Sequence, residues 1–426
     1  MRLKFVIVLF QSIQLWCMVA GASAYAQSPG NDTLKLSMKD AEKAFINNNL
    51  TLLAQHYNID NASAQLITAK LFPNPDFNFA NGLYNNTHDA YRNQSLGLSQ
   101  LFTTAGKRNK NIVLAKISID QAKYQFFDLI RTLRFTLRSD FYNIYFQQQS
   151  AKVYDQEISS LAKTLTVFEE QYHKGNIAQK EVLRIQSQLY SLQAEYNNLL
   201  TGIDTTENEL KMLIKASPGS YLLPLVNPDA NHQISVTTIP YQQLLDSASV
   251  NRYDLRNARA SVNYNQINLA LQKAVAVPDI SLSVSYDKFG GFNNNYLGGG
   301  IEFNLPFFNR NQGAIKQARI AIDQSKVQLQ NQQNQVEMDL TTAYKGALRI
   351  EKLYNGFDPD FKDNFTHLIQ EVFKNYQKRN IGLLEFLDFY DSYKNNLLQF
   401  NNIQLSKATT LEQLNFVTGT PFFNQQ

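Results

Sequence analysis

The chain has almost no thiol or indole: its only cysteine, Cys17, and its only tryptophan, Trp16, lie near the start of its 426 residues. Beyond residue 26 no side chain is available for a disulfide, a thiolate metal site or a cysteine nucleophile. The five histidines are His56, His88, His173, His232 and His367. No two of them stand four residues apart, so we predict no structural or catalytic metal site.

Charge is scarce as well. Charged residues make up 18% of the chain and the formal net charge is +4, so no basic face for nucleic acid is expected. The triple glycine 298–300 falls in a strand-like segment and not before a helix, which does not suit a phosphate-binding loop. No nucleophile and general base occur at a catalytic spacing. We therefore expect no enzymatic activity and no cofactor.

Residues 1–26 are typical of a cleavable signal peptide. Arg2 and Lys4 precede a mostly apolar run over residues 5–19, and residues 24–26 match an A-x-A cleavage site. The run is short and interrupted by polar residues, which favours cleavage over a membrane anchor. After residue 27 no run of 18 apolar residues occurs, so no transmembrane helix is predicted. We expect the mature protein to leave the cytoplasm.

The mature chain consists of two similar halves. Residues 115–121 match residues 318–324, and the offset between the halves stays at 203 to 204 residues. We assign a first repeat to residues 27–216 and a second repeat to residues 241–426. Residues 217–240, which contain four prolines, are predicted to form a linker.

Each half shows the same order of predicted elements: a helix, a β-hairpin, a long helix, a turn and a return helix. The paired ranges are 37–71 and 241–276 for the first helices, 75–102 and 278–305 for the hairpins, and 105–172 and 311–376 for the long helices. Ser37, three residues before Asp40, predicts an N-cap. Apolar residues of the long helices recur at the spacing of a coiled coil, and a kink is expected at Asp358-Pro359.

Two hairpins supply only four strands, with lengths close to the roughly ten residues that cross a bilayer. Four strands cannot close a barrel, and open strand edges are not tolerated in lipid. If the hairpins cross a membrane, several chains must share one barrel, and three chains would supply twelve strands. The predicted fold is therefore mainly α, with long coiled-coil helices forming an α-barrel and a shared twelve-stranded trimeric β-barrel. A periplasmic coiled-coil scaffold without a pore is the alternative.

Several segments resemble the TolC-type outer-membrane efflux proteins, and the resemblance covers essentially all of the mature chain. The most specific segments are NRYDL (251–255) and the two turns YHKGNIAQKEVL (172–183) and YQKRNIGLLEFL (376–387). TAGKRNK (104–110) and LPFFNRNQGAI (305–315) resemble the branch that serves heavy-metal efflux of the cobalt–zinc–cadmium type.

This resemblance implies a homotrimer in contact with outer-membrane lipid in a bacterial cell, with its helical part in the periplasm. It implies a passive exit duct of a tripartite efflux system. The tip of the duct would bind a periplasmic adaptor, or membrane fusion protein, that links it to an inner-membrane RND-type pump. The heavy-metal branch implies metal cations as cargo, whereas an exit duct for protein secretion is the other alternative.

The two turns between long and return helices are predicted to contact the adaptor, because they lie at the far ends of the helices and carry apolar side chains that would otherwise stay exposed. The candidate adaptor-contact residues are Tyr172, Gly175, Ile177, Val182, Tyr376, Ile381 and Leu383. One departure from the repeat stands here, because Arg379 occupies the position that matches Gly175.

A gate is predicted just after the second turn. Glu385 and Asp388 lie three residues apart and therefore share one helix face. Around a threefold axis they would form two carboxylate rings, which favour cations and repel anions. Glu181 holds the matching step in the first repeat, but Arg184 stands where Asp388 has its counterpart, so a symmetric acidic gate is not expected. The alternative is a solvated helix face, which Asp391 one turn further on fits equally well.

Overall fold

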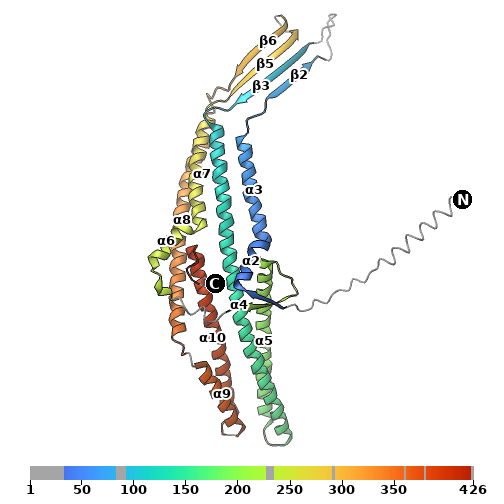
Figure 1. The fold of residues 1–426 in the computed structure, drawn as a ribbon, viewed down its shortest axis with the longest axis vertical. Coiled ribbons are helices and arrows are strands. Elements are labelled where there is room, and N and C mark those ends of the chain that lie inside the picture. Colours follow the sequence, from blue (N-terminus) through green and yellow to red (C-terminus); the bar gives the residue numbers. More distant parts are fainter. Residues whose placement is uncertain are drawn as a thin grey trace, which may run out of the picture.

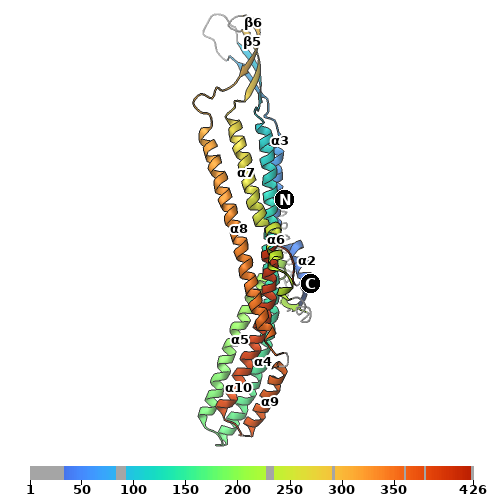
Figure 2. The same ribbon diagram turned by 90° about the vertical axis from the view of Figure 1, so that its left-hand side faces the viewer.

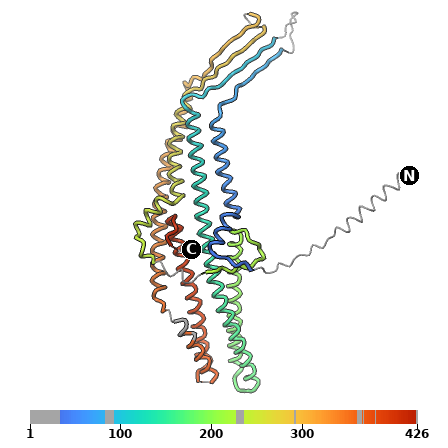
Figure 3. Tube along the Cα trace, in the orientation of Figure 1, coloured from blue at the N-terminus to red at the C-terminus, as the bar shows by residue number. Residues whose placement is uncertain are grey.

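The computed structural model describes residues 33–82, 93–226, 235–289, 293–358, 361–378 and 380–423. The expected signal peptide lies outside the described residues. Figure 1 shows a long, narrow molecule with a β-sheet at one end and two helical hairpins at the other. Figure 3 shows that the chain passes back and forth along the long axis and that the C-terminal helix ends near the middle of the molecule, which we call the waist.

The first repeat contains seven elements in the described ranges. They are β1 (Thr33–Ser37), α2 (Met38–Asn48), α3 (Leu50–Lys70), β2 (Asp76–Asn81), β3 (Gln94–Phe102), α4 (Lys107–His173) and α5 (Gln179–Ile214). The remaining elements are β4 (Tyr221–Leu225), the 3₁₀ turn η2 (Val236–Thr238), α6 (Tyr241–Asn251), α7 (Tyr253–Val275), β5 (Ile280–Phe289), β6 (Asn294–Glu302), α8 (Gln312–Asn355), α9 (Phe361–Gln377) and α10 (Leu383–Thr418).

The four strands of the two hairpins join in one antiparallel sheet, in the order β2-β3-β5-β6. One face is apolar, since Phe79 pairs with Leu96 and Leu98 pairs with Val284. The other face is small and polar, as in the pair of Ser99 with Ser283. The apolar face is largely exposed to the surroundings of the single chain. Each of the edge strands β2 and β6 has one strand neighbour in the described chain.

The predicted first helix of each repeat is wrong in one respect, because each is broken into two helices at matching positions, Asn49 and Arg252. The side chain of Asn49 caps α3 by accepting a hydrogen bond from the Leu52 amide (2.9 Å). Its amide nitrogen donates to the Leu213 carbonyl (2.9 Å), at the end of α5. The break thus has a physical cause, a side chain that caps one helix end and satisfies another. The predicted N-cap at Ser37 is confirmed, since its Oγ accepts from the Asp40 amide (3.2 Å).

The segment predicted as a linker contains a strand. β4 pairs in parallel with β1, so that Leu34 lies opposite Leu222 and Leu36 opposite Pro224. Proline is tolerated there because a two-stranded sheet leaves one side of each strand without a partner. This small sheet ties residues near the start of the first repeat to the residues that follow its last helix.

The long helix of the first repeat is confirmed within two residues, as the 67-residue helix α4. Its counterpart is not continuous: α8 ends at Asn355, and residues 356–358 are not helical. Gly356 closes the end of α8 with bonds from its amide to the Lys352 and Leu353 carbonyls, so the predicted kink is an interruption. Pro359 lies outside the described residues. Within the described ranges no helix carries an apolar run long enough to cross a membrane.

The two return helices end alike, each in a left-handed residue. Lys215 closes α5 with φ +55°, and Gly419 closes α10 with φ +69°. A Cβ added to Gly419 would lie 3.2 Å from the Arg252 amide nitrogen and 3.2 Å from the Asn251 carbonyl carbon. The second position therefore requires glycine both for its backbone angles and for the close approach of the α6–α7 break.

We predict opposite effects of substitution at these two helix ends. Gly419→Ala should lower the free energy of unfolding by about 1–2 kcal/mol through the left-handed backbone and the crowded Cβ, whereas Lys215→Gly should raise it by up to about 1 kcal/mol. Urea unfolding in detergent, followed by circular dichroism, measures both. Destabilisation by Lys215→Gly as large as that by Gly419→Ala would contradict the assignment of strain.

Candidate functional site

The tip is the end of the molecule farthest from the sheet, where the hairpins α4–α5 and α9–α10 lie side by side (Figures 1 and 2). The two turns are built alike. The amide of Asn176 donates to the Gln171 carbonyl (2.9 Å), and the amide of Asn380 donates to the Asn375 carbonyl (2.9 Å). Gly175 supplies the positive φ of the first turn (+77°). Arg379 lies outside the described residues.

The two hairpins share one apolar core at the tip. Tyr376 stacks between Phe168 and Phe386, with ring centroids 5.6 Å and 4.7 Å away. Deeper in, the Tyr390 hydroxyl donates to the Glu157 carbonyl (2.6 Å). Burial, and next the charge of Glu181, raise the pKa of the Tyr376 phenol well above its ordinary value. The aromatic rings thus hold α4, α9 and α10 together.

Four of the candidate contact residues are covered within the chain itself. Val182 is buried in the tip core, and Ile177, Ile381 and Leu383 pack against it half-buried. They are covered because each hairpin presents its apolar stripe to the other. Sequence periodicity shows such a stripe but not which neighbour covers it.

Other residues at the tip remain open to solvent. Tyr172 is exposed, as predicted for a contact residue, and so are Leu183 and Leu384, which the sequence analysis did not select. Leu384 is 65% exposed, immediately beside the half-buried Leu383. The sequence signal that could have identified Leu384 is its position directly after a core-facing residue at the start of α10.

A groove of about 1480 Å³ runs between the two hairpins at the tip. Its walls come from α4, both turns and the end of α9. The predicted site residues that line it are Gly175, Ile177, Glu181, Tyr376, Ile381 and Leu383. The structure thus brings six of the predicted residues to one surface, whereas Val182 lies in the core behind it.

Two of the three gate candidates lie on the first turns of α10, and the third lies on α5. Glu385 and Asp388 are both exposed, whereas Glu181, on α5, is half-buried. Asp391, considered above as a solvated residue, is half-buried and accepts a hydrogen bond from Gln188 (2.8 Å). Burial raises the pKa of the Asp391 carboxyl, although the charge of Lys394 opposes the shift.

Lys394 is the charged residue at the tip that sequence reasoning missed. It is only 5% exposed, and its Nζ lies 3.0 Å from Glu195 Oε2 and 4.0 Å from Asp391 Oδ1. Because Glu195 belongs to α5, this ion pair joins the first hairpin to the second. The spacing of Asp391 and Lys394 by three residues was the only sequence signal. Among the described residues, no group of three acidic, histidine or cysteine side chains is arranged to hold a metal ion.

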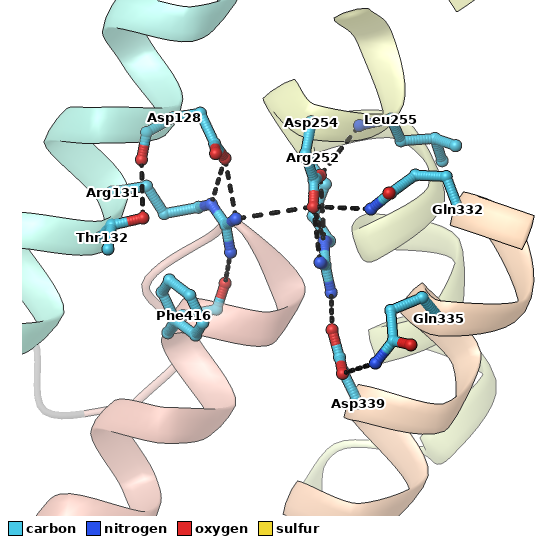
Figure 4. Close-up of polar contacts among 10 residues, drawn as sticks. All are labelled: Asp128, Arg131, Thr132, Arg252, Asp254, Leu255, Gln332, Gln335, Asp339 and Phe416. Atoms are coloured by element: carbon cyan, nitrogen blue, oxygen red, sulfur yellow. Dashed lines mark hydrogen bonds and ion pairs between the residues drawn. The ribbon is translucent and has the colours of Figure 1, made fainter. Parts of the chain in front are cut away.

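A second polar cluster lies at the waist, where the NRYDL segment separates α6 from α7 (Figure 4). Arg252 Nη2 lies 2.6 Å from Asp254 Oδ2, and Arg252 Nη1 lies 2.9 Å from Asp339 Oδ2 on α8. Arg131 of α4 approaches Asp254 Oδ2 at 3.6 Å and donates to the Phe416 carbonyl of α10 (2.8 Å). Four helices therefore meet at one group of charges.

This cluster lowers the pKa of Asp254. Burial alone would raise the pKa of Asp254, but the hydrogen bonds and charge of Arg252, with Arg131, hold it below its ordinary value. A carboxyl whose pKa is lowered by folding stabilises the folded state above its unfolded pKa, and the contribution is lost as the pH falls through the lowered pKa.

Comparison with known proteins gives a family match over part of the chain and a fold match over most of it. Residues 43–214 match the sequence model of a family described as outer membrane efflux protein. The fold is that of the CmeC outer membrane channel of Campylobacter jejuni (TM-score 0.75, 16% identity, 91% of this chain and 87% of that one). It is also that of the open state of the MtrE outer membrane channel of Neisseria gonorrhoeae (TM-score 0.72, 16% identity, 91% and 89%).

The chain thus matches an outer-membrane efflux family over residues 43–214 and has the fold of outer-membrane channels, which is the fold that the sequence analysis predicted. Among characterised relatives it is similar to the cobalt-zinc-cadmium resistance protein CzcC of Cupriavidus metallidurans. The two are 20% identical over 308 residues, which cover 71% of this chain and 72% of that protein.

We predict that Arg252→Met lowers the free energy of unfolding by about 2–3 kcal/mol at neutral pH, because the half-buried carboxylates of Asp254 and Asp339 lose the buried guanidinium that they share. The matched control is Arg256→Met, since Arg256 donates to the Val250 carbonyl (2.8 Å) and should cost about 1 kcal/mol. The difference between wild type and Arg252→Met should shrink as the pH falls from the unfolded carboxyl pKa of about 3.9 through the lowered pKa of folded Asp254. Equal losses in the two variants would contradict the role of the cluster.

Proposed function

We propose that three copies of this chain form a continuous passive duct, with the sheets closed into one barrel in the outer membrane and the helices forming a tube in the periplasm. The observation that carries the proposal is a four-stranded sheet that is apolar on one exposed face and open at both edges. In lipid those edges require partners, and two further copies provide them. A helix of 67 residues reaches about 100 Å from the sheet, far beyond one membrane.

The other face of the sheet would line the barrel. Ser and Gly are its most frequent residues, beside larger ones such as Tyr296. Its charged residues in the described strands are Asp76, Asp287 and Glu302. An all-acidic lining favours cations over anions. Together with the similarity to a cobalt-zinc-cadmium resistance protein, this supports metal cations as the cargo.

We predict a trimeric mass in detergent and stepwise conductance in planar bilayers, with cations permeating better than anions. The mass is measured by light scattering or native mass spectrometry, and the ion preference by the reversal potential in a salt gradient. A stable monomer with intact strand content, or a trimer that conducts no ions, would refute the duct and favour a scaffold without a pore.

The tip is the proposed docking site for a periplasmic adaptor that connects the duct to an inner-membrane pump of the RND type. The groove between the hairpins gives a partner a concave surface lined by both repeats. Leu183, Leu384 and Tyr172 supply the exposed apolar contacts beside it. The candidate residues in the core, such as Val182, would shape this surface and not touch the partner.

We predict that Leu384→Arg abolishes crosslinking to the adaptor while trimers remain intact, because Leu384 lies outside the tip core. Met212→Arg is the matched control, since Met212 is also exposed but lies at the waist end of α5. Crosslinking is measured with the periplasmic adaptor purified from the same bacterium. Equal crosslinking in wild type and Leu384→Arg would place the docking surface elsewhere.

Glu385 and Asp388 are the proposed selectivity gate of the duct, because both carboxylates are free in solvent at the narrow end of the helices. We predict that Glu385→Gln with Asp388→Asn raises anion conductance and weakens block by divalent cations. The control removes two exposed carboxylates from α8, in Asp323→Asn with Glu337→Gln. If both double variants keep the wild-type selectivity and block, the two carboxylates are ordinary surface charges.

A further inference from the structure

The connection that follows β3 is anchored on the second repeat. Lys107, the first residue of α4, places its Nζ 2.7 Å from Asp279 Oδ1, just before β5 begins. The Thr104 amide donates to the same oxygen (2.8 Å). These contacts close the base of the sheet at the boundary between β3 and β5, which is the boundary between the two repeats.

The connection that follows β6 is held at its end by Asn311, whose Nδ2 donates to the Gln272 carbonyl (2.8 Å), but no ion pair with a described residue anchors it. Arg310 stands 203 positions after Lys107 and so occupies its place in the second repeat. Its Nε donates to the Phe307 carbonyl (3.3 Å), and among the described residues it forms no ion pair. Phe308 beside it is 95% exposed. Figure 2 shows this connection bowing away from the others at the base of the sheet.

The matching acid lies on the opposite edge of the sheet. Asp76, the first residue of β2, stands 203 positions before Asp279 and occupies its place in the first repeat. It is exposed and has no ion pair with any described residue. The chain therefore has a cation, Arg310, after the edge strand β6 and an anion, Asp76, at the start of the edge strand β2.

We propose that Arg310 of one copy pairs with Asp76 of a second copy, where the β6 edge of the first joins the β2 edge of the second. Inside one chain, β3, which precedes Lys107, is antiparallel to β5, which follows Asp279. Lys107 and Asp279 both lie at the end of the sheet nearest the helices. At the boundary between copies, β6 precedes Arg310 and β2 begins with Asp76. The strand directions and the order of the charges there are the same as between β3 and β5. The pair is thus the intermolecular counterpart of Lys107 and Asp279, and it rests on the proposed trimer.

The difference in length between the connections supports this assignment. Residues 103–106 join β3 to α4, whereas residues 303–311 join β6 to α8. Arg310 therefore precedes its helix, where its backbone amide donates to Gln312 Oε1 (2.8 Å), and a second copy would supply the carboxylate that its guanidinium lacks among the described residues. Docking there would also cover Phe307 and Phe308, which are exposed in the single chain.

The first experiment is thiol crosslinking between copies. Full-length protein carrying Asp76→Cys and Arg310→Cys is treated in its membrane with a short bis-maleimide and run on a denaturing gel. We expect dimer and trimer bands, which are absent from each single variant and from the pair Asp76→Cys with Lys288→Cys at the far end of β5. Crosslinking of the control pair alone, or of neither pair, would overturn the proposal.

The second experiment is a charge-reversal cycle, read as the association constant of detergent-solubilised trimers. Asp76→Arg and Arg310→Asp should each weaken association roughly tenfold to a hundredfold, because three such pairs are lost per trimer. The double variant, with the charges exchanged, should recover most of this loss, whereas Lys288→Glu should change little. Losses that add in the double variant would show that the residues do not meet and that the aromatic connection contacts lipid instead.

These outcomes distinguish a failure of the Arg310–Asp76 contact from a failure of the proposed trimeric duct. A wild-type protein that is monomeric by mass would refute the trimer itself. A wild-type trimer that shows neither the crosslink nor the recovery would refute only the contact between Arg310 and Asp76.

Discussion

The backbone groups at the two edges of one small sheet constrain the whole molecule. If the apolar face of this four-stranded sheet lies in lipid, as proposed, every backbone donor and acceptor of the sheet needs a protein partner. β2 and β6 lack that partner on one side, and the chain has no further strand in the described ranges to supply it. The repeat resolves the problem, because the boundary between β3 and β5 inside one chain already shows how β6 can meet β2 of another.

Much of this architecture could be predicted because its signals are local and occur twice. The alternation of apolar and polar residues marked the strands, and the coiled-coil spacing marked α4 to within two residues of each end. The breaks at Asn49 and Arg252 could not be predicted in the same way. Each depends on residues far away in the chain, the Leu213 carbonyl in one case and Asp339 in the other.

The tip shows the same limit at the candidate site. Glu385 and Asp388 lie exposed on one helix, as their spacing suggested, but spacing could not tell that Ile381 and Leu383 would be covered by the other hairpin. Lys394 escaped notice because a lysine among Asn and Gln residues looks like a solvated surface. Its significance arises only when α5 brings Glu195 within 3.0 Å of its nitrogen.

The parallel pairing of β1 with β4 also sets an order for folding. Leu34 meets Leu222 only after 222 − 34 = 188 further residues have been made. Closing so long a loop is slow and entropically costly, so β1 must wait while α4 and α5 form their local contacts. β4, the strand that pairs with β1, is made before any residue of the second repeat. At the waist, therefore, β4 can complete the first repeat while the second repeat is still being made.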